Sequence, residues 1–236
     1  MNAVAEGIAA MDWDAAEAGL DEQGWAILPG LLGPAACDDL AALYEAPDIF
    51  RSHVVMARHG FGRGEYRYFA YPLPPMVQAL RTILYARLAM VANRWHARMG
   101  IETRFPAAHA DYLARCHEAG QRRPTPLLLH YGAGDYNCLH QDLYGAHVFP
   151  FQAAVLLSEP GRDFAGGEFV LTEQRPRAQS RAMVVPLRKG DIVLFAVNSR
   201  PRRGARGDHR VALRHGVSTV TAGTRRTLGV IFHDAA

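Results

Sequence analysis

The chain has 236 residues, which is enough for one well-buried domain and too few for two domains of ordinary size. Hydrophobic residues make up 49% and charged residues 21%, a balance that is ordinary for a folded globular protein and excludes an intrinsically disordered chain. No apolar run approaches the roughly 18–20 residues that a membrane helix needs, so we expect no membrane partner.

The ends and the cysteines indicate a reduced, cytoplasmic setting. The N-terminus begins MNAVAEGIAAMDWD, without the basic start of a signal peptide. Cys37, Cys116 and Cys138 are widely spaced and odd in number, so they form neither a disulfide framework nor a zinc-binding pattern.

Charge is distributed unevenly along the chain. Residues 1–50 hold ten acidic residues and no lysine or arginine, which leaves 26 basic against 13 acidic side chains in the remainder. Lys189 is the only lysine, so nearly all of the positive charge is arginine. Two interpretations stay open: a composition that uses arginine wherever a cation is needed, or a basic face that binds a polyanion.

Regular helices are predicted in the first half of the chain. Residues 34–46 begin with proline at the first helical position and stop at Pro47. Residues 75–99 form the strongest predicted helix, with Gly100 beyond its end. Its apolar side chains recur at helical spacing: Val77, Leu80, Leu84, Leu88, Val91 and Trp95. Residues 58–75, between the two helices, are rich in glycine, aromatic and basic residues and are expected to form an irregular loop or lid.

Short β-rich runs with turn residues between them follow from about residue 125. They read LLLHYGAG, AHVFPFQAAVLLSE, GGEFVLTE, AMVVPL, GDIVLFAV, HGVSTVTA and RTLGVIFHD. Many short strands after a helical half predict an α+β fold, with a double-stranded β-helix (jelly roll) core braced by N-terminal helices. We expect one domain over residues 1–236, in which about 1–120 are mainly helical support and lid and about 125–234 form the catalytic core.

His140, Gln141 and Asp142 form the central motif. Residues i and i+2 of a strand share a face, so His140 and Asp142 can converge on one ion while Gln141 points away. His215 lies 73 residues after Asp142, at the head of another β-run, and supplies a third ligand. Two histidines and one carboxylate leave positions open, as in non-haem Fe(II) oxygenases, although such a set can also hold catalytic zinc.

Further motifs surround this set of ligands. Tyr131 lies nine residues before His140, and Arg225 lies ten residues after His215. With FAGGEF (164–169) and KGDIVLF (189–195) between them, these residues resemble the 2-oxoglutarate/Fe(II) oxygenase superfamily, which includes prolyl-hydroxylase-type enzymes and AlkB-type nucleic-acid demethylases. The resemblance covers roughly residues 127–234.

The resemblance implies a role for each motif residue. His140, Asp142 and His215 would hold Fe(II), and Arg225 would bind the far carboxylate of 2-oxoglutarate, with Tyr131 beside it. Molecular oxygen would be the oxidant and ascorbate a reductant. Arg226 competes with Arg225, because neighbours on a strand face opposite ways, and the spacing favours Arg225.

For the substrate, GRGEYRYFAYPLP and HYGAGDYNCLHQD resemble bacterial oxygenases associated with oxidative repair of alkylated nucleic acid. Two basic segments favour a single-stranded or damaged nucleic acid as partner: residues 198–214, expected near the mouth of the barrel, and residues 58–71, where arginines alternate with aromatic residues. The candidate substrate-binding residues are Arg58, Arg63, Arg67, Tyr66, Tyr68, Arg202, Arg203 and Arg206.

One departure keeps other substrates open. RRTLGVIFHDA lacks the second arginine that AlkB-type enzymes carry after the distal histidine, and the spacing from His215 to Arg225 matches prolyl-hydroxylase-type oxygenases instead. A protein side chain or a small metabolite is therefore an alternative substrate. A metal-binding jelly roll that acts as a sensor is the non-enzymatic alternative.

Overall fold

The fold of this chain was taken from a computed structural model, which describes residues 2–175, 177–205 and 207–236. Helices lie in the first half of the sequence, where the apolar spacing predicted them. Their bounds are α1 (Asn2–Ala10), α2 (Trp13–Gln23), α3 (Pro34–Ala42), α4 (Pro75–Arg98) and α5 (His109–Glu118). Within the described ranges, none of these helices is both long enough and apolar enough to cross a membrane.

A large antiparallel sheet forms the centre of the molecule. Its strands lie side by side in the order β1 (Trp25–Leu28), β11 (Ile192–Ala196), β7 (Phe151–Leu156), β15 (Arg225–Ile231), β5 (Leu127–Tyr131), β4 (Glu65–Phe69) and β2 (Phe50–Val55). Strands far apart in the sequence are therefore neighbours, and β1 from the N-terminal region closes one edge of the sheet.

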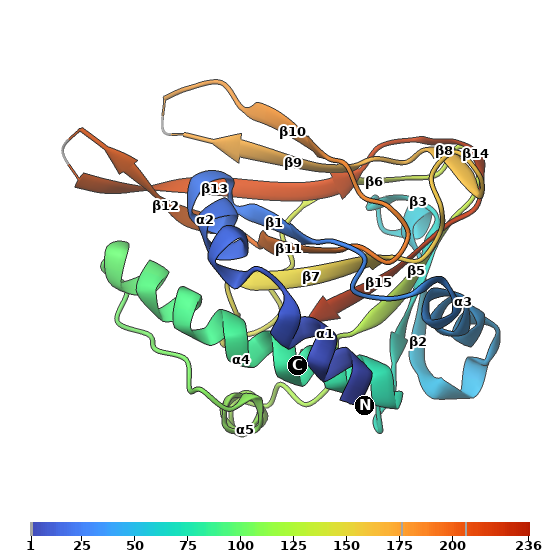
Figure 1. The fold of residues 1–236 in the computed structure, drawn as a ribbon, viewed down its shortest axis with the longest axis horizontal. Helices are drawn as coiled ribbons and strands as arrows, with labels where there is room; N and C mark the ends of the chain where they lie inside the picture. The colour runs from blue at the N-terminus through green and yellow to red at the C-terminus, as the bar shows by residue number, and fades with distance from the viewer. Residues whose placement is uncertain (1, 176, 206) are drawn as a thin grey trace.

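A smaller antiparallel sheet stacks over the large one (Figure 1). Its order is β10 (Arg181–Val185), β9 (Phe169–Gln174), β13 (Gly207–Val217), β6 (Tyr136–His140) and β3 (Gly62–Arg63), with β12 (Ser199–Gly204) paired to β13. A separate pair, β8 (Phe164–Gly166) and β14 (Val220–Gly223), lies beside them. Two facing antiparallel sheets braced by helices confirm the predicted jelly-roll core.

Helix α4 packs on the outer face of the large sheet, where Figure 1 also places α1 and α5. The predicted apolar stripe of α4 is fully buried, and the Trp95 ring lies 4.5 Å from the ring of Phe151 on β7, measured between centroids. Because side chains alternate along a strand, Phe151 faces the helices and its neighbour Gln152 faces the space between the sheets. The helices thus cover one face and leave the other free for a site.

A buried ion pair ties α4 to the segment that follows the last strand. The guanidinium Nη2 of Arg81 lies 2.7 Å from Oδ1 of Asp234, and both side chains are fully buried. Tyr71 and His117 also contact the Asp234 carboxylate, and Arg81 donates to the carbonyl of Ile231. The charged groups are therefore matched by polar partners, as burial requires.

The first half of the chain contains more strand than the sequence predicted. The segment 58–75, expected to be irregular, contributes β3 and β4, and Phe50–Val55 forms β2. Strand β4 pairs with β5 of the large sheet, with Tyr66 opposite Leu129. The glycine-rich composition hid β3 and β4, because each is short and is held in place by pairing with a strand that is distant in the sequence.

Candidate metal centre

Two paired strands bring the predicted metal ligands together. His140 is the last residue of β6, and it lies directly opposite His215 of β13. Gly216 permits this close approach, since a Cβ there would lie 2.6 Å from the carbonyl oxygen of Asn137. Asp142 follows two residues after β6. One ligand atom from each of the three residues lies within 4.8 Å of the others.

Local hydrogen bonds orient the three side chains. Nδ1 of His140 lies 2.8 Å from the Cys138 carbonyl, which leaves Nε2 facing the other ligands. That Nε2 is 3.5 Å from one oxygen of Asp142, and Nε2 of His215 is 3.4 Å from the other. Gln141 turns away, as predicted, and donates to the Leu213 carbonyl. His215 lies near the end of β13, although the sequence placed it at the head of a strand.

Tyr144, which no sequence motif indicated, supports the carboxylate ligand. Its hydroxyl donates to Oδ1 of Asp142 at 2.6 Å, and the hydroxyl of Tyr68 lies 3.2 Å from that of Tyr144. The sequence places Tyr144 two residues after Asp142, but only the fold shows that its ring turns toward the carboxylate.

The protonation states of the centre suit metal binding. Burial raises the pKa of Asp142, but its contacts with the His215 and His140 rings and the hydrogen bond from Tyr144 outweigh burial and hold the pKa below its ordinary value. Burial lowers the pKa of His215, which keeps its ring neutral. An ionised carboxylate and neutral imidazoles are the forms that bind a cation.

A buried arginine lies at another wall of the same cavity. Arg225 begins β15 opposite Tyr131 of β5, and each side chain is at most 1% exposed. Its Nη1 donates to Oγ1 of Thr227 at 2.5 Å, but its Nε has no hydrogen-bond partner, and no carboxylate lies within 4.0 Å of the guanidinium in the described ranges. Burial lowers the pKa of Arg225 to about 10, so the side chain is still a cation at neutral pH.

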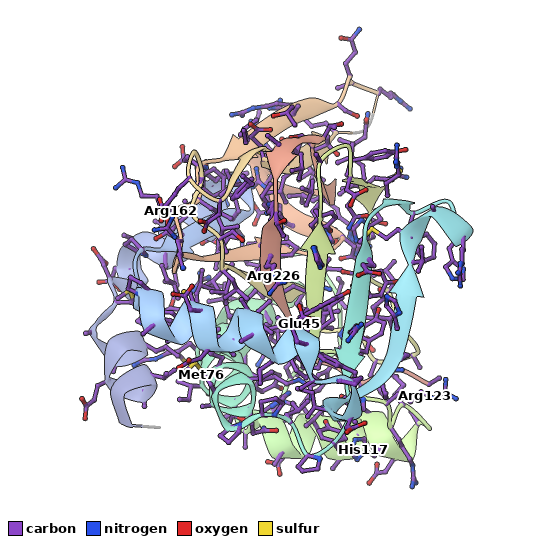
Figure 2. All side chains as sticks on the ribbon, turned by 90° about the vertical axis from the view of Figure 1, so that its right-hand side faces the viewer. Glu45, Met76, His117, Arg123, Arg162 and Arg226 are labelled. Atoms are coloured by element: carbon purple, nitrogen blue, oxygen red, sulfur yellow. The ribbon has the colours of Figure 1, made fainter. Side chains whose placement is uncertain are left out.

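Arg226 points the opposite way, toward α3. Figure 2 shows Arg226 beside Glu45, and its Nη2 lies 3.1 Å from the Glu45 carboxylate. Nη1 donates to the Ala41 carbonyl at the end of α3. The predicted register of this strand is therefore confirmed: Arg225 faces inward, while Leu228, Val230 and Phe232 continue the buried face toward the helices.

One cavity of about 340 Å³ connects the three ligands with Arg225. Tyr131 and Thr227 line it beside the arginine, and Gln152, a further residue that the sequence did not single out, lines it from β7. Nε2 of Gln152 is also buried without a partner among the described residues. Many of the other lining residues are apolar. The three candidate ligands and the unpaired donors of Arg225 and Gln152 therefore face a largely apolar space.

The basic and aromatic residues of segment 58–71 are divided by the fold. Tyr66 and Tyr68 line the cavity, as their predicted role requires. Arg58 and Arg63 are exposed and do not line the cavity. Arg67 faces away from the cavity: it donates to the Tyr44 carbonyl and its guanidinium lies over the Tyr44 ring. The expectation for Arg67 is therefore corrected, because alternation on β4 turns it outward.

The arginine-rich segment 198–214 does not surround the mouth as expected. It forms the β12–β13 hairpin, whose tip extends to the left in Figure 1. Arg202 pairs with the buried carboxylate of Glu173, and the exposed Arg203 lies opposite Asp208, seven residues from His215. At about 3.4 Å per residue, that separation exceeds 20 Å. Arg206 lies outside the described residues.

Comparisons with known proteins agree with this architecture. The fold is similar to that of a Pseudomonas putida prolyl-4-hydroxylase (TM-score 0.53, 15% identity, 91% of this chain and 95% of that chain). It is also similar to that of a 2OG-Fe(II) oxygenase family oxidoreductase from Burkholderia pseudomallei (TM-score 0.51, 18% identity, 94% of this chain and 91% of that chain). At these identities, the likeness shows the fold.

Sequence comparisons define the family. An uncharacterized protein of Mycobacterium tuberculosis is 48% identical over 168 residues, which cover 71% of this chain and 72% of that protein. Residues 64–235 match a family model described as "Oxygenase, catalysing oxidative methylation of damaged DNA", and this match includes the three ligands and Arg225. The chain therefore belongs to this Oxygenase-NA family of oxygenases.

Proposed function

We propose that this protein is an Fe(II)- and 2-oxoglutarate-dependent dioxygenase that oxidises an alkyl group on damaged nucleic acid. The observation that carries the proposal is that the His140, Asp142 and His215 ligand set and the unpaired, buried Arg225 face one cavity. A metal-only role would not require a buried cation without a counter-ion in the same cavity.

The ligand set fits a divalent iron. His140, Asp142 and His215 would hold the ion from one side, a donor set associated with non-haem Fe(II) oxygenases. When bound, Fe(II) supplies the activation of O2 that couples decarboxylation of 2-oxoglutarate to oxidation of the substrate, with ascorbate as a reductant. Tyr144 holds the Asp142 carboxylate in place through its hydrogen bond.

Arg225 fits the distal carboxylate of 2-oxoglutarate. A guanidinium offers planar, paired donors, and a charge-assisted contact in a dry cavity is stronger than one in water. The hydrogen bond to Thr227 fixes one side of the guanidinium, which leaves the remaining donors for the dicarboxylate. Gly167 makes room for this side chain, since a Cβ there would lie 3.0 Å from Cδ of Arg225.

The family description supports damaged nucleic acid as the substrate class. Hydroxylation of an N-methyl group gives a hemiaminal, which releases formaldehyde and leaves the N–H of the repaired base. Overall, the methylated base, O2 and 2-oxoglutarate give the unmethylated base, formaldehyde, succinate and CO2. An oxygenase acting on a methylated base thus removes the alkyl group.

Anaerobic Fe(II) titration and succinate release test the proposal. We expect one Fe(II) per chain and slow 2-oxoglutarate turnover that methylated oligonucleotides accelerate, with formaldehyde as co-product. His140→Ala and Asp142→Ala should each abolish binding and turnover, whereas His147→Ala, outside the ligand set, should retain both. Full turnover in either ligand variant would refute the site. Acceleration by peptides or metabolites, but not by oligonucleotides, would refute the substrate class.

A further inference from the structure

We propose that a surface beside the cavity mouth, here called the β3–β6 rim, binds single-stranded nucleic acid and presents one unpaired base to the cavity. The rim consists of Phe61, Arg63, Tyr136 and Leu139. This inference rests on the proposed function, and it assigns strand binding to the rim in place of the arginine-rich β12–β13 hairpin.

Strand pairing fixes the rim at the entrance. In β3, Arg63 lies opposite Tyr136 of β6, and the Cys138 amide donates to the Phe61 carbonyl at 2.9 Å. Phe61 and Leu139 line the cavity, yet their side chains are 48% and 44% exposed. Tyr136 is 37% exposed. Phe61 and Leu139 therefore belong both to the cavity mouth and to the outer surface, and Tyr136 is an exposed neighbour of theirs on β6.

Large exposed apolar side chains gather at this entrance. Leu143, one residue after Asp142, is also 47% exposed. The His59 ring stacks on Phe61, with 5.3 Å between ring centroids and 23° between ring planes. Flat aromatic faces in contact with water are what unpaired bases stack on, whereas paired bases are already stacked within the duplex.

Positive charge flanks these apolar groups. The Arg63 side chain is 63% exposed, and its Nε reaches the Asp135 carboxylate only at 4.0 Å. This guanidinium group can therefore contact a phosphate beside a base that enters the cavity.

Two of the hairpin arginines are engaged with the protein itself. Both Arg200 and Arg202 pair with the Glu173 carboxylate of β9. Asp208 pairs with Arg98 of α4, which docks the hairpin on the helical layer. The exposed Arg203 of β12 lies opposite Asp208, which is more than about 20 Å from His215 along β13. Arg203 is therefore too far away to hold the phosphates next to a base at the ligand set.

A single strand fits this geometry better than a duplex. The ligand set lies between two sheets, so a base must leave its stack to reach it. Tyr66 and Tyr68 form one wall of the cavity and offer ring faces to such a base. An unpaired base enters at no pairing cost, and its neighbours can stack on Phe61 and Tyr136.

Fluorescence anisotropy with a labelled, unmodified 12-nucleotide single strand tests the rim, with the matching duplex as a second probe. Metal-loaded protein is compared with Phe61→Ala, with Arg63→Ser, and with Arg203→Ser as a matched hairpin control. We expect Phe61→Ala to weaken binding on the order of tenfold. The Arg63→Ser variant should reduce the slope of log K against log salt by about 0.7, for one lost phosphate contact. Arg203→Ser should match the wild type, and thermal melting should show every variant folded.

Distinct results overturn the rim and the oxygenase assignment. Tighter binding of the duplex, a larger loss in Arg203→Ser than in the rim variants, or no binding by the wild type at low salt would overturn the rim. In each case, Fe(II) binding and 2-oxoglutarate turnover, measured on the same samples, would still support an oxygenase. Loss of both in the wild type, with rim-dependent strand binding intact, would instead overturn the proposed function.

Discussion

Replacing Arg225 by methionine should abolish tight 2-oxoglutarate binding and stabilise the protein that lacks this ligand. Burial lowers the pKa of Arg225 from 12.5 to about 10, and a fall of this size corresponds to about 3 kcal/mol of penalty on the charged form. Methionine removes that penalty but loses the hydrogen bond to Thr227, about 1 kcal/mol. A net gain of about 2 kcal/mol should raise the Tm by about 5 °C in a chain of this size.

The same change, Arg225→Met, should weaken the binding of 2-oxoglutarate. Removing one partner of a buried charge pair costs about 2–5 kcal/mol, so the Kd for 2-oxoglutarate should rise by about 30-fold or more. Calorimetry on Mn(II)-loaded protein measures the Kd, and thermal melting without 2-oxoglutarate measures stability. Arg226→Met is the matched control: it breaks the contact with Glu45 and should leave the Kd unchanged. A larger loss of affinity in Arg226→Met, or an Arg225→Met variant that melts lower and binds normally, would refute the reasoning.

Three other outcomes follow from the buried polar groups. Tyr144→Phe removes the hydrogen bond to Asp142, so it should weaken Co(II) binding about 10- to 100-fold and change the Co(II) absorption spectrum. The control Tyr136→Phe should leave both the affinity and the spectrum unaltered. An unchanged spectrum in Tyr144→Phe would exclude a positioning role for Tyr144. Arg81→Ala leaves the Asp234 carboxylate buried with only Tyr71 and His117 as side-chain partners, so it should lower the free energy of unfolding by about 3–5 kcal/mol in urea titration. The control Arg94→Ala breaks exposed pairs and should cost less than about 1 kcal/mol. Burial lowers the pKa of His109 and of His233 to about 4, so the unfolded chain binds protons first as the pH falls below about 6.5. The free energy of unfolding should be full above that pH and should decline by up to about 2.7 kcal/mol per pH unit toward pH 4. A flat profile over this range would contradict buried, neutral rings.

Local patterns in the sequence were sufficient for several features of the fold. The apolar spacing of residues 75–99 predicted α4, because the stripe on a helix depends only on neighbours three and four residues away. The β-rich runs after residue 125 predicted most strands of the two sheets for a similar reason. The ordered motif of His140, Asp142, His215 and Arg225 predicted residues that the fold brings to one cavity. Their roles toward iron and 2-oxoglutarate stay predictions.

Other features depend on contacts between distant segments, and only the tertiary structure decided them. Strands β3 and β4 were missed because they pair with the distant strands β6 and β5, and β2 was missed because it joins the sheet only through β4. The sequence did not show which way the other basic side chains point: Arg67 turns outward, and Arg202 is held by Glu173. Tyr144 became part of the site only when its ring was placed against Asp142. The sequence by itself determined which residues are chemically able to form a metal centre and an anion site, because residue type and spacing are local properties. The tertiary structure decided which of them face the cavity, because side-chain direction follows from strand register and from the packing of sheets around it.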